Sequence, residues 1–324
     1  MVYHKSKVMN KLKELYYSSY FLNFLIYPVI KFVKILKNQF YLSDLNFAKK
    51  KFKFYFNYDL DISNPVTLNE KIQYLKLHDR NPFYSNLVDK INVKKYISKI
   101  VGDKHIIPTL KTFSSIENFN LDFDFDYPIV IKTNNGSGDF KILYEPPNSY
   151  DLKKIKIMFS KSLKRDLYYE KKEWQYKGIK PQLLIEPLLQ DLNNEIPPDY
   201  KIHCFNGEPE FIYVTKGREK ETYRGVYTLD WKPLDFIWSH VHKETGDPIY
   251  NFQNNISKPK NLLEILTISK IICKSFDNKY VRIDVYNMNE KSVYFGEITF
   301  HHMSGFARII PHEWDIKLGK KLKI

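Results

Sequence analysis

The feature that most constrains this chain is a pair of short apolar segments close to its C-terminal end. They are residues 281–286 (VRIDVY) and 293–300 (VYFGEITF), and the residues between them, 287–291, are polar. Apolar and polar residues alternate along both segments, which is the pattern of a half-buried β-strand. Two such runs joined by a short polar turn predict an antiparallel hairpin.

Each predicted strand of this hairpin carries a carboxylate among its apolar residues. With a period of two, Arg282 and Asp284 project from one face of the first strand, and Glu297 and Thr299 share a face of the second. Two hard oxygen donors on adjacent strands suit Mg²⁺, which completes its shell with water and phosphate oxygens. Arg282 beside them can stabilise a migrating phosphoryl group or an oxyanion. An ordinary hairpin with solvated charges is the alternative.

A lysine followed by small residues marks a second candidate element. Residues 127–132 (YPIVIK) form a short apolar strand that ends at Lys132, and residues 133–139 (TNNGSGD) follow. Small residues let backbone N–H groups approach an anion, and Lys132 adds a point charge for a phosphate. The spacing differs from the G-x-x-x-x-G-K-[ST] pattern, because the lysine precedes the glycines. A plain glycine-serine hairpin turn is the alternative.

Two further strands carry charged residues within apolar surroundings. Residues 181–189 (PQLLIEPLL) predict a buried strand that runs into a linker and contains Glu186. Residues 199–208 (DYKIHCFNGE) predict another strand, which contains Lys201 and ends in a turn. Both charged residues precede the C-terminal hairpin in the chain.

The order of these residues resembles that of the ATP-grasp enzymes, and in particular of their TupA-like branch, which is named for teichuronopeptide synthesis. The resemblance spans roughly residues 60–318 and is carried by residues 64–76 (NPVTLNEKIQYLK), 88–90 (VDK), 132–138 (KTNNGSG), 173–176 (EWQY), 199–201 (DYK) and 296–300 (GEITF). The final hairpin is also similar to that of D-alanine:D-alanine ligases, where an R-x-D-x-x strand precedes an E-x-N strand. Asp284 and Glu297 match the metal-binding carboxylates of those ligases. Thr299 replaces the asparagine, and a hydroxyl is a poorer magnesium donor.

The resemblance implies an α+β, ATP-grasp fold in which a nucleotide lies between two antiparallel-rich sheets, with ATP and Mg²⁺ as cofactors. The site residues that it implies fall into groups by role. Lys132 and Lys201 would hold phosphates, with Asn134, Ser137 and Gly138 over them; Glu186 and Leu188 would lie at the adenine; Asp284, Glu297 and Thr299 would hold the metal; Arg282 would stabilise the acylphosphate oxyanion.

The reaction that the resemblance implies joins a carboxylate to an amine. The acceptor carboxylate attacks the γ-phosphate of ATP to form an acylphosphate, and an amine then displaces phosphate. Because this branch is often encoded with polysaccharide genes, we expect a uronic-acid carboxylate as acceptor and an amino acid or amine as nucleophile. Arg218, Arg224 and Arg308 in predicted loops could bind the acidic sugar, or could be ordinary surface arginines. His301 and His302 could deprotonate the amine, or only form hydrogen bonds.

Two other functions stay open at this point. A glycosyltransferase would need a D-x-D triplet, which the DFDFD run of residues 122–126 contains formally, although its alternation predicts an edge strand. A basic protein with a degenerate ATP site, bound to anionic lipid or nucleic acid, is the non-enzymatic alternative. The chain has a formal charge of +14 and so attracts polyanions. It lacks the sequence signature of a nucleic-acid module, so we expect no nucleic-acid partner.

The cysteine content favours a reducing compartment. Cys204 and Cys273, the only cysteines among 324 residues, lie in apolar contexts without metal-ligand spacing. Neither a zinc site nor a disulfide framework is therefore expected, and the cytoplasm is the expected location.

The N-terminal segment, residues 1–57, differs from the rest because it is basic and aromatic. A membrane-spanning helix is not expected there, since Lys31 and Lys34 interrupt the apolar run at residues 20–36 and Pro28 would kink it. A small-residue cleavage site is also missing, so we expect the segment to be retained. It could lie on an anionic membrane surface or pack on the core.

The remainder of the chain is expected to form two parts. Residues 58–125 predict a helical part before the ATP-grasp region, in which Thr67 and Glu70 form a capping box at the start of a helix. Residues 126–324 are expected to form the nucleotide-binding and catalytic subdomains.

Overall fold

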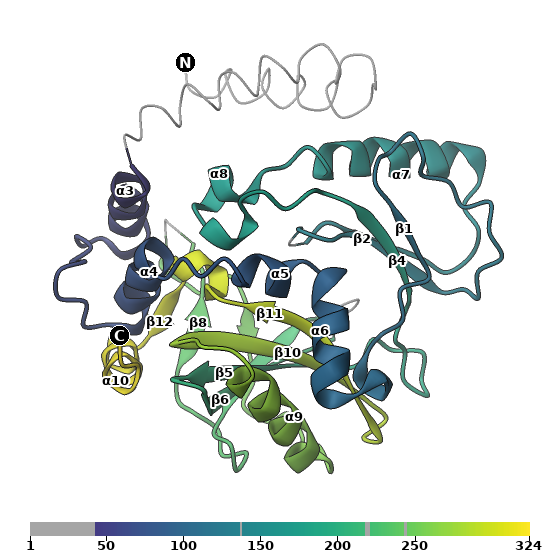
Figure 1. Ribbon diagram of the computed structural model, residues 1–324. Coiled ribbons are helices and arrows are strands. Elements are labelled where there is room, and N and C mark those ends of the chain that lie inside the picture. The colour runs from purple at the N-terminus through teal and green to yellow at the C-terminus, as the bar shows by residue number, and fades with distance from the viewer. Residues whose placement is uncertain (1–42, 137, 218–220, 243–244) are drawn as a thin grey trace.

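The computed structural model describes residues 43–136, 138–217, 221–242 and 245–324, whose arrangement Figure 1 shows. The apolar run at residues 20–36, Ser137 and Arg218 lie outside the described residues. Two main sheets face each other, and helices cover their outer faces (Figure 1). This is the α+β arrangement that the sequence predicted.

The described chain begins with a series of helices. They are α3 (Asp44–Phe56), α4 (Leu68–His78), α5 (Tyr84–Val88) and α6 (Asn92–Val101). The predicted capping box starts α4: the Thr67 hydroxyl accepts from the Glu70 N–H at 3.1 Å, and the Glu70 carboxylate accepts from the Thr67 N–H at 2.9 Å. This exchange satisfies two N–H groups that have no partner within the helix.

Helix α3, the described part of the N-terminal segment, packs on the rest of the structure through aromatic side chains. Phe47, Phe52 and Phe56 are buried in one apolar cluster with Phe306, which follows the C-terminal hairpin. Residues 44–56 therefore pack on the core, which is one of the two alternatives that the sequence left open for residues 1–57. No helix in the described ranges is long and apolar enough to cross a membrane.

The first sheet has four strands and carries the predicted lysine strand in its middle. Its strands are β1 (Lys111–Phe113), β2 (Ile129–Thr133), β3 (Phe140–Leu143) and β4 (Leu183–Pro187), in the order β1-β4-β2-β3, and all neighbours are antiparallel. Ile129 and Ile131 pack against Ile155 and Phe159 of α7 (Ser149–Ser162). Because side chains alternate along a strand, Lys132 points to the opposite face.

The second sheet has six strands and contains the C-terminal hairpin. Its strands are β5 (Asp199–Phe205), β6 (Glu208–Lys216), β7 (Tyr223–Tyr227), β9 (Asn251–Phe252), β10 (Tyr280–Met288) and β11 (Ser292–Thr299). The order is β11-β10-β5-β6-β7-β9, and only the β7–β9 pair is parallel. Val281, Ile283 and Val285 pack in one apolar cluster with residues of α9 (Leu262–Lys274). Arg282 and Asp284 consequently face away from α9, toward the first sheet.

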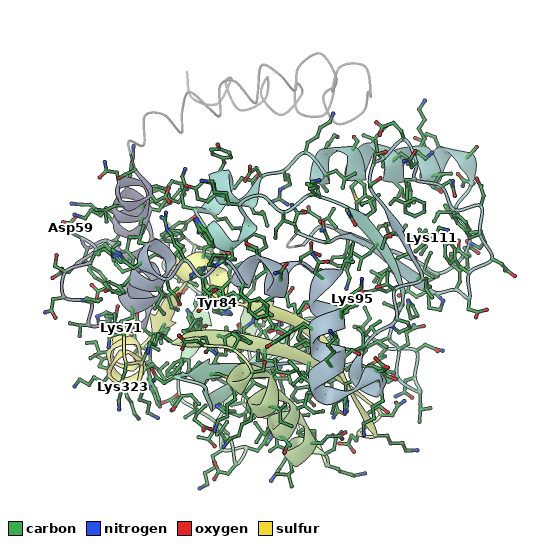
Figure 2. The ribbon with its side chains drawn as sticks, viewed as in Figure 1. Asp59, Lys71, Tyr84, Lys95, Lys111 and Lys323 are labelled. Carbon is green, nitrogen blue, oxygen red and sulfur yellow. The ribbon has the colours of Figure 1, made fainter. Side chains whose placement is uncertain are left out.

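The remaining elements of the described fold are mostly short. They are α8 (Leu167–Lys171), β8 (Ile237–Ser239), β12 (Arg308–Ile310), α10 (His312–Lys321) and the 3₁₀ turns η1 (Asp103–His105), η2 (Trp174–Tyr176) and η3 (His302–Gly305). Strands β8 and β12 pair with each other, and α10 packs on α4 (Figure 1). Side chains fill the space between these elements, as Figure 2 shows around Tyr84, whose ring stacks on Phe300 at 3.9 Å between centroids.

The structure corrects one expected element. Residues 122–126 do not form the predicted edge strand, because the described residues there belong to no β-ladder. Phe125 instead packs against the apolar cluster under α7, and Phe123 lies beneath the Lys111 ammonium, 3.9 Å from the ring centroid. The alternation of aromatic and acidic residues thus reflects packing of a loop.

Candidate active site

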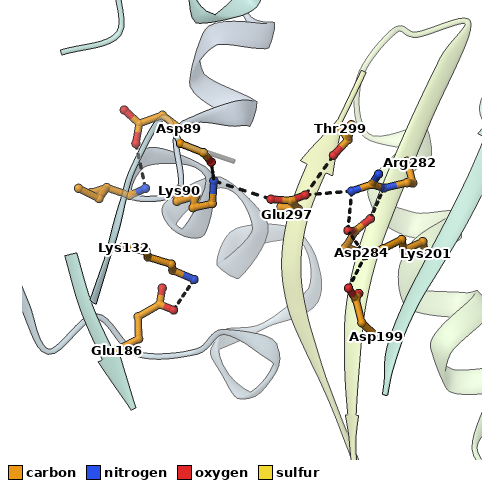
Figure 3. A network of polar contacts seen from close by, with 12 residues as sticks. Asp89, Lys90, Lys132, Glu186, Asp199, Lys201, Arg282, Asp284, Glu297 and Thr299 are labelled. Atoms are coloured by element: carbon orange, nitrogen blue, oxygen red, sulfur yellow. Dashed lines mark hydrogen bonds and ion pairs between the residues drawn. The ribbon is translucent and has the colours of Figure 1, made fainter. Parts of the chain in front are cut away.

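The two sheets enclose a cavity of about 510 Å³ between them. Charged side chains from both sheets line it, and they include most of the residues that the sequence had singled out. The charged residues that line the cavity are Lys90, Lys132, Asp139, Glu186, Asp199, Lys201, Arg282, Asp284 and Glu297. Figure 3 shows two sets of ion pairs among them: Lys132 pairs with Glu186, while Lys90, Glu297, Arg282, Asp284 and Lys201 form a connected series. Strands β2 and β4 therefore supply one wall, and β5, β10 and β11 supply the other.

The two carboxylates of the hairpin lie directly opposite each other in the β10–β11 ladder. Arg282 joins them, because its Nη2 donates to Asp284 Oδ2 at 2.7 Å and to Glu297 Oε1 at 2.9 Å. Its Nε also donates to Asp284 Oδ1 at 2.6 Å. The predicted hairpin and the predicted meeting of its carboxylates are both present.

Lys201 extends this network onto strand β5. Lys201 lies opposite Asp284 in the β5–β10 ladder, and its Nζ donates to Asp284 Oδ2 at 2.8 Å. The same ammonium contacts Asp199, two residues earlier on β5. Lys201 therefore forms ion pairs with two carboxylates and lines the cavity wall.

Glu186 forms a separate cluster with two lysines on the opposite wall. Lys132 Nζ lies 2.6 Å from Glu186 Oε2, and Lys94 Nζ lies 2.5 Å from Oε1. The carboxylate side chain is only 2% exposed, so both cations compensate its burial. Glu186 lines the cavity, and it also fixes the ammonium group of Lys132 there.

The turn after β2 approaches the cavity through its glycines. Gly136 and Gly138 line the cavity, and Gly138 has a φ of +83°. Lys90 Nζ donates to the Gly136 carbonyl at 2.6 Å and lies 3.7 Å from Glu297. Lys90 thus connects the turn on one wall with a hairpin carboxylate on the other.

Of three further residues that were predicted to belong to the site, only one lines the cavity. Asn134 does not line the cavity, because its buried amide donates to Asp89 at 3.0 Å and accepts from the Gln182 N–H at 2.8 Å. Leu188 does line the cavity, next to the strand end of β4. Thr299 is outside the lining, and its hydroxyl donates to Glu297 Oε1 at 3.3 Å. The buried side chain of Asn134 therefore connects two other segments of the chain by hydrogen bonds.

The surrounding cations set the charge of the hairpin carboxylates. Burial raises the pKa of Glu297, but Lys90 and Arg282, with smaller effects from Lys201 and Lys132, lower it to about 2. Burial is the dominant influence on Asp284 and raises its pKa, although Arg282 and Lys201 act in the opposite direction. Burial lowers the pKa of Lys90, while Glu297 raises it. The network therefore keeps Glu297 ionised.

Lys90 and Lys94 are site residues to which the sequence gave no role. Residues 88–90 belonged to the motifs that carried the family resemblance, but no local pattern connected Lys90 to a phosphate or a carboxylate. Lys94 lies four residues further on, within α6, whereas Lys90 precedes that helix. No local signal in the sequence therefore indicates that either lysine belongs to the site.

The donor set of the hairpin fits Mg²⁺. Asp284 and Glu297 offer hard oxygens from adjacent strands at a cavity wall, and Mg²⁺ commonly takes one or two carboxylates and completes its shell with phosphate and water. Within the described ranges, no group of three or more histidine, cysteine, aspartate and glutamate side chains could hold a metal on its own. A metal at this site would consequently need oxygens from a ligand.

Comparison with solved structures gives distant similarities. A D-alanine–D-alanine ligase from Bacillus anthracis complexed with ATP shares 15% identity at a TM-score of 0.35, covering 66% of this chain and 54% of that one. An L-amino acid ligase from Bacillus licheniformis shares 12% identity at a TM-score of 0.42, covering 73% and 49%. This chain thus spans about half the length of these proteins.

Comparison by sequence gives a family. No curated protein matches the chain. The family described as TupA-like ATPgrasp matches it over residues 70–323, which include both cavity walls. Because this match extends over most of the sequence, the predicted ATP-grasp fold is confirmed, and the chain belongs to the TupA-like ATP-grasp family.

Proposed function

We propose that the chain is an ATP-dependent ligase that joins an amine to a carboxylate through an acylphosphate. The observation that carries this proposal is the cavity between two sheets, where Lys132, Lys201 and Arg282 converge around the facing carboxylates Asp284 and Glu297. Cations bind the phosphates of a nucleotide, and the carboxylates suit the metal that accompanies it.

Each wall of the cavity has a separate task in this proposal. Lys132 and Lys90 would hold phosphate oxygens from one side, and Lys201 would hold them from the other. The glycine turn at 136 and 138 would bring backbone N–H groups close to the same phosphates. Leu188 would contact the base, and Glu186 would keep Lys132 in place through the 2.6 Å ion pair.

Asp284 and Glu297 are the residues that would hold Mg²⁺. When bound, the metal neutralises charge on the phosphates and orients them. Arg282 would stabilise the oxygens of the phosphoryl group and of the acylphosphate, because its guanidinium is buried beside both carboxylates and cannot lose its proton. All three side chains act by position and charge.

The lining of the cavity favours transfer to an external acceptor. Among the described residues that line it, none is a serine or a cysteine. Positioning and charge neutralisation account for most of the catalysis of phosphoryl transfer, so a protein nucleophile is not needed. The acceptor carboxylate would attack the γ-phosphate, ADP would leave, and an amine would then displace phosphate to form the amide.

We propose a uronic acid or a related acidic glycan as the acceptor, and an amino acid or amine as the nucleophile. The family resemblance to polysaccharide-associated proteins and the charge of +14 support an acidic substrate. Of the two candidate arginines that the structure describes, Arg224 lies on β7 and not in a loop, and its guanidinium lies 3.4 Å from the ring centroid of Tyr250, which lines the cavity. Arg308 is engaged elsewhere, because its Nε donates to the Tyr55 carbonyl at 2.7 Å.

Oxygen-18 in the acceptor carboxylate tests the reaction class. An acylphosphate route moves one labelled oxygen into the released phosphate, and hydroxylamine intercepts the intermediate as a hydroxamate. Purified full-length chain, ATP, Mg²⁺ and a panel of uronic acids with amino acids should therefore give labelled phosphate. The Asp284→Asn variant serves as the inactive control. Unlabelled phosphate, or sugar transfer from a nucleotide-sugar donor, would contradict the ligase proposal.

A further inference from the structure

The guanidinium of Arg282 has a third partner besides the two carboxylates. Its Nη1 lies 2.7 Å from Nδ1 of His302, which comes from the turn η3 after the hairpin. His302 is 1% exposed, and its ring lies against Trp238, Tyr213 and His203 at centroid distances of 4.2, 5.6 and 5.0 Å. The ring orientation is consequently fixed by packing on several sides.

The chemistry of this contact determines the tautomer of His302. Arginine donates hydrogen bonds and has no acceptor, so Nδ1 of His302 must be the unprotonated nitrogen and Nε2 must carry the hydrogen. Burial lowers the pKa of His302 well below its usual range, and the neighbouring Arg282 lowers it further. A neutral ring therefore faces the guanidinium.

The turn that presents His302 has an unusual backbone. Met303, Ser304 and Gly305 have consecutive φ values of 47°, 58° and 68°. Residues other than glycine disfavour this left-handed region of backbone conformation. Met303 and Ser304 therefore need contacts from outside the turn to keep this conformation. Gly305 cannot be replaced freely, since a Cβ would lie 2.5 Å from the Gln73 amide nitrogen.

Two other sequence motifs provide these contacts. Gln73 of α4 donates to the carbonyls of Ser304 and Gly305 at 2.9 and 2.7 Å, and Lys76 donates to the Ser304 carbonyl at 3.0 Å. The Ser304 hydroxyl contacts the carboxylate of Glu173. Gln73 and Lys76 belong to residues 64–76, and Glu173 belongs to residues 173–176, which are motifs without an assigned role in binding ATP.

We propose that His302 is a positioning residue that orients Arg282 toward the reacting phosphoryl group, and that Gln73, Lys76 and Glu173 hold the turn that presents it. This inference rests on the proposed ligase function. It assigns a role to the conformation of residues 302–305. The carboxylates fix Nε and Nη2 of the guanidinium, and His302 fixes Nη1, so the plane of Arg282 has no remaining freedom.

Two substitutions at His302 separate hydrogen bonding from packing. Asparagine is smaller than histidine, but its Oδ1 leaves Cγ at the position of Nδ1 and accepts a hydrogen bond. Leucine fills more of the aromatic pocket and cannot accept. We expect His302→Leu to lower kcat by about 10- to 100-fold, as for other residues that orient a reacting group, and to leave the affinity for ATP with Mg²⁺ unchanged. We expect His302→Asn to keep most of the turnover despite its poorer packing.

A pair of variants on α4 tests the turn. Gln73→Met removes both amide contacts to the carbonyls of Ser304 and Gly305, and should lower kcat in the same direction as His302→Leu. Lys71→Met is the matched control, because Lys71 lies on the same helix but donates to the Leu322 carbonyl at 2.7 Å, near the C-terminal helix (Figure 2). Equal turnover of the Gln73 and Lys71 variants would overturn the role given to the turn.

The tautomer of His302 can be measured independently of enzymatic turnover. In full-length chain labelled with ¹⁵N-histidine, the signal that disappears in His302→Asn should show an unprotonated Nδ1 and a protonated Nε2. A protonated Nδ1 would overturn the proposal, and so would His302→Leu with wild-type kcat or a parallel loss in both His302 variants. If the wild-type chain forms no ADP with any acceptor while the ¹⁵N signal is as expected, the ligase function fails and the contact stands.

Discussion

Asp284 and Glu297 lie directly opposite each other on β10 and β11, and one nitrogen of Arg282 contacts both. Lys201 Nζ donates to the same oxygen of Asp284, Oδ2, at 2.8 Å, and Lys90 Nζ lies 3.7 Å from the other oxygen of Glu297, Oε2. Cations of the protein therefore already neutralise the carboxylates that would hold the metal. In the proposed site, phosphates would attract these cations and so free the carboxylate oxygens for a metal. We therefore expect the binding of nucleotide and the binding of Mg²⁺ to be coupled.

The first prediction is that Mg²⁺ alone does not stabilise the folded chain. A ligand that binds only the folded state at 100 times its Kd raises the free energy of unfolding by about 2.7 kcal/mol. We expect a rise of this size with ATP and Mg²⁺ together, and almost none with Mg²⁺ alone, in thermal unfolding at fixed protein concentration. A shift with Mg²⁺ alone that matches the shift with both would contradict the coupling.

The second prediction concerns the two carboxylates separately. Asp284→Asn and Glu297→Gln keep the shape of each side chain and remove its charge, so both should abolish Mg²⁺-dependent ADP formation. The variants should differ in stability, because the side chain of Asp284 is 4% exposed and that of Glu297 is 38% exposed. Loss of one partner from a buried ion pair costs about 3 to 5 kcal/mol, so Asp284→Asn should lose more in chemical denaturation. Retained ADP formation in both variants would place the metal elsewhere.

The third prediction concerns Lys132. Lys132→Ala should weaken ATP binding by roughly 1.5 to 3 kcal/mol, because it removes a charge-assisted contact to phosphate. The fold should tolerate this change, since Glu186 keeps its ion pair with Lys94 at 2.5 Å. Lys141→Ala is the control: Lys141 is an exposed lysine on the neighbouring strand β3 and lies outside the cavity lining. Titration calorimetry that finds the same affinity in both variants would remove Lys132 from the nucleotide site.

The hairpin shows how much of the site the sequence could predict. A period of two predicts the face on which each carboxylate lies. Asp284 and Glu297 lie opposite each other, however, only because the ladder shifts register by one residue between Asp284 and Val285, and the alternation does not predict this shift. The pairing of Glu186 with Lys132 and Lys94 could not be predicted in this way. Lys94 approaches from α6, and no sequence pattern distinguishes it among the chain's 51 lysines and arginines.

Asn134 shows a second reason why contacts in the structure differ from those expected from the sequence. Its position beside the glycine turn suggested a phosphate contact, but its amide joins Asp89 and Gln182, which are remote in sequence. Buried amides must find partners wherever the fold supplies them, and such partners depend on tertiary packing. The same holds for the turn at Met303 and Ser304, because its left-handed backbone depends on α4.

The fourth prediction uses the buried ammonium of Lys76. Burial lowers its pKa to about 7, although Glu173 and Asp44 raise it. A lysine in the unfolded chain has a pKa of about 10.4, so between these values the unfolded chain binds one more proton than the folded chain. The free energy of unfolding should therefore rise with pH over this window, by at most about 1.4 kcal/mol per pH unit from this group. Urea denaturation from pH 7 to 10 should show that the difference in the free energy of unfolding between the wild type and Lys76→Met changes with pH. A constant difference would contradict the lowered pKa.

The last prediction concerns residues 1–42, where the sequence has a basic and aromatic run at residues 20–36. If this run lies on a membrane surface, vesicles with anionic lipid should bind the full-length chain, and salt should weaken that binding because it screens the lysines. The cut must leave α3 in place, since Phe47, Phe52 and Phe56 are buried in the core. A chain that begins at Ser43 should therefore stay folded and keep its response to ATP with Mg²⁺. It should remain in the supernatant when the vesicles are sedimented. Vesicle binding that survives this truncation would show that the folded part, with its own lysines, contacts the lipid.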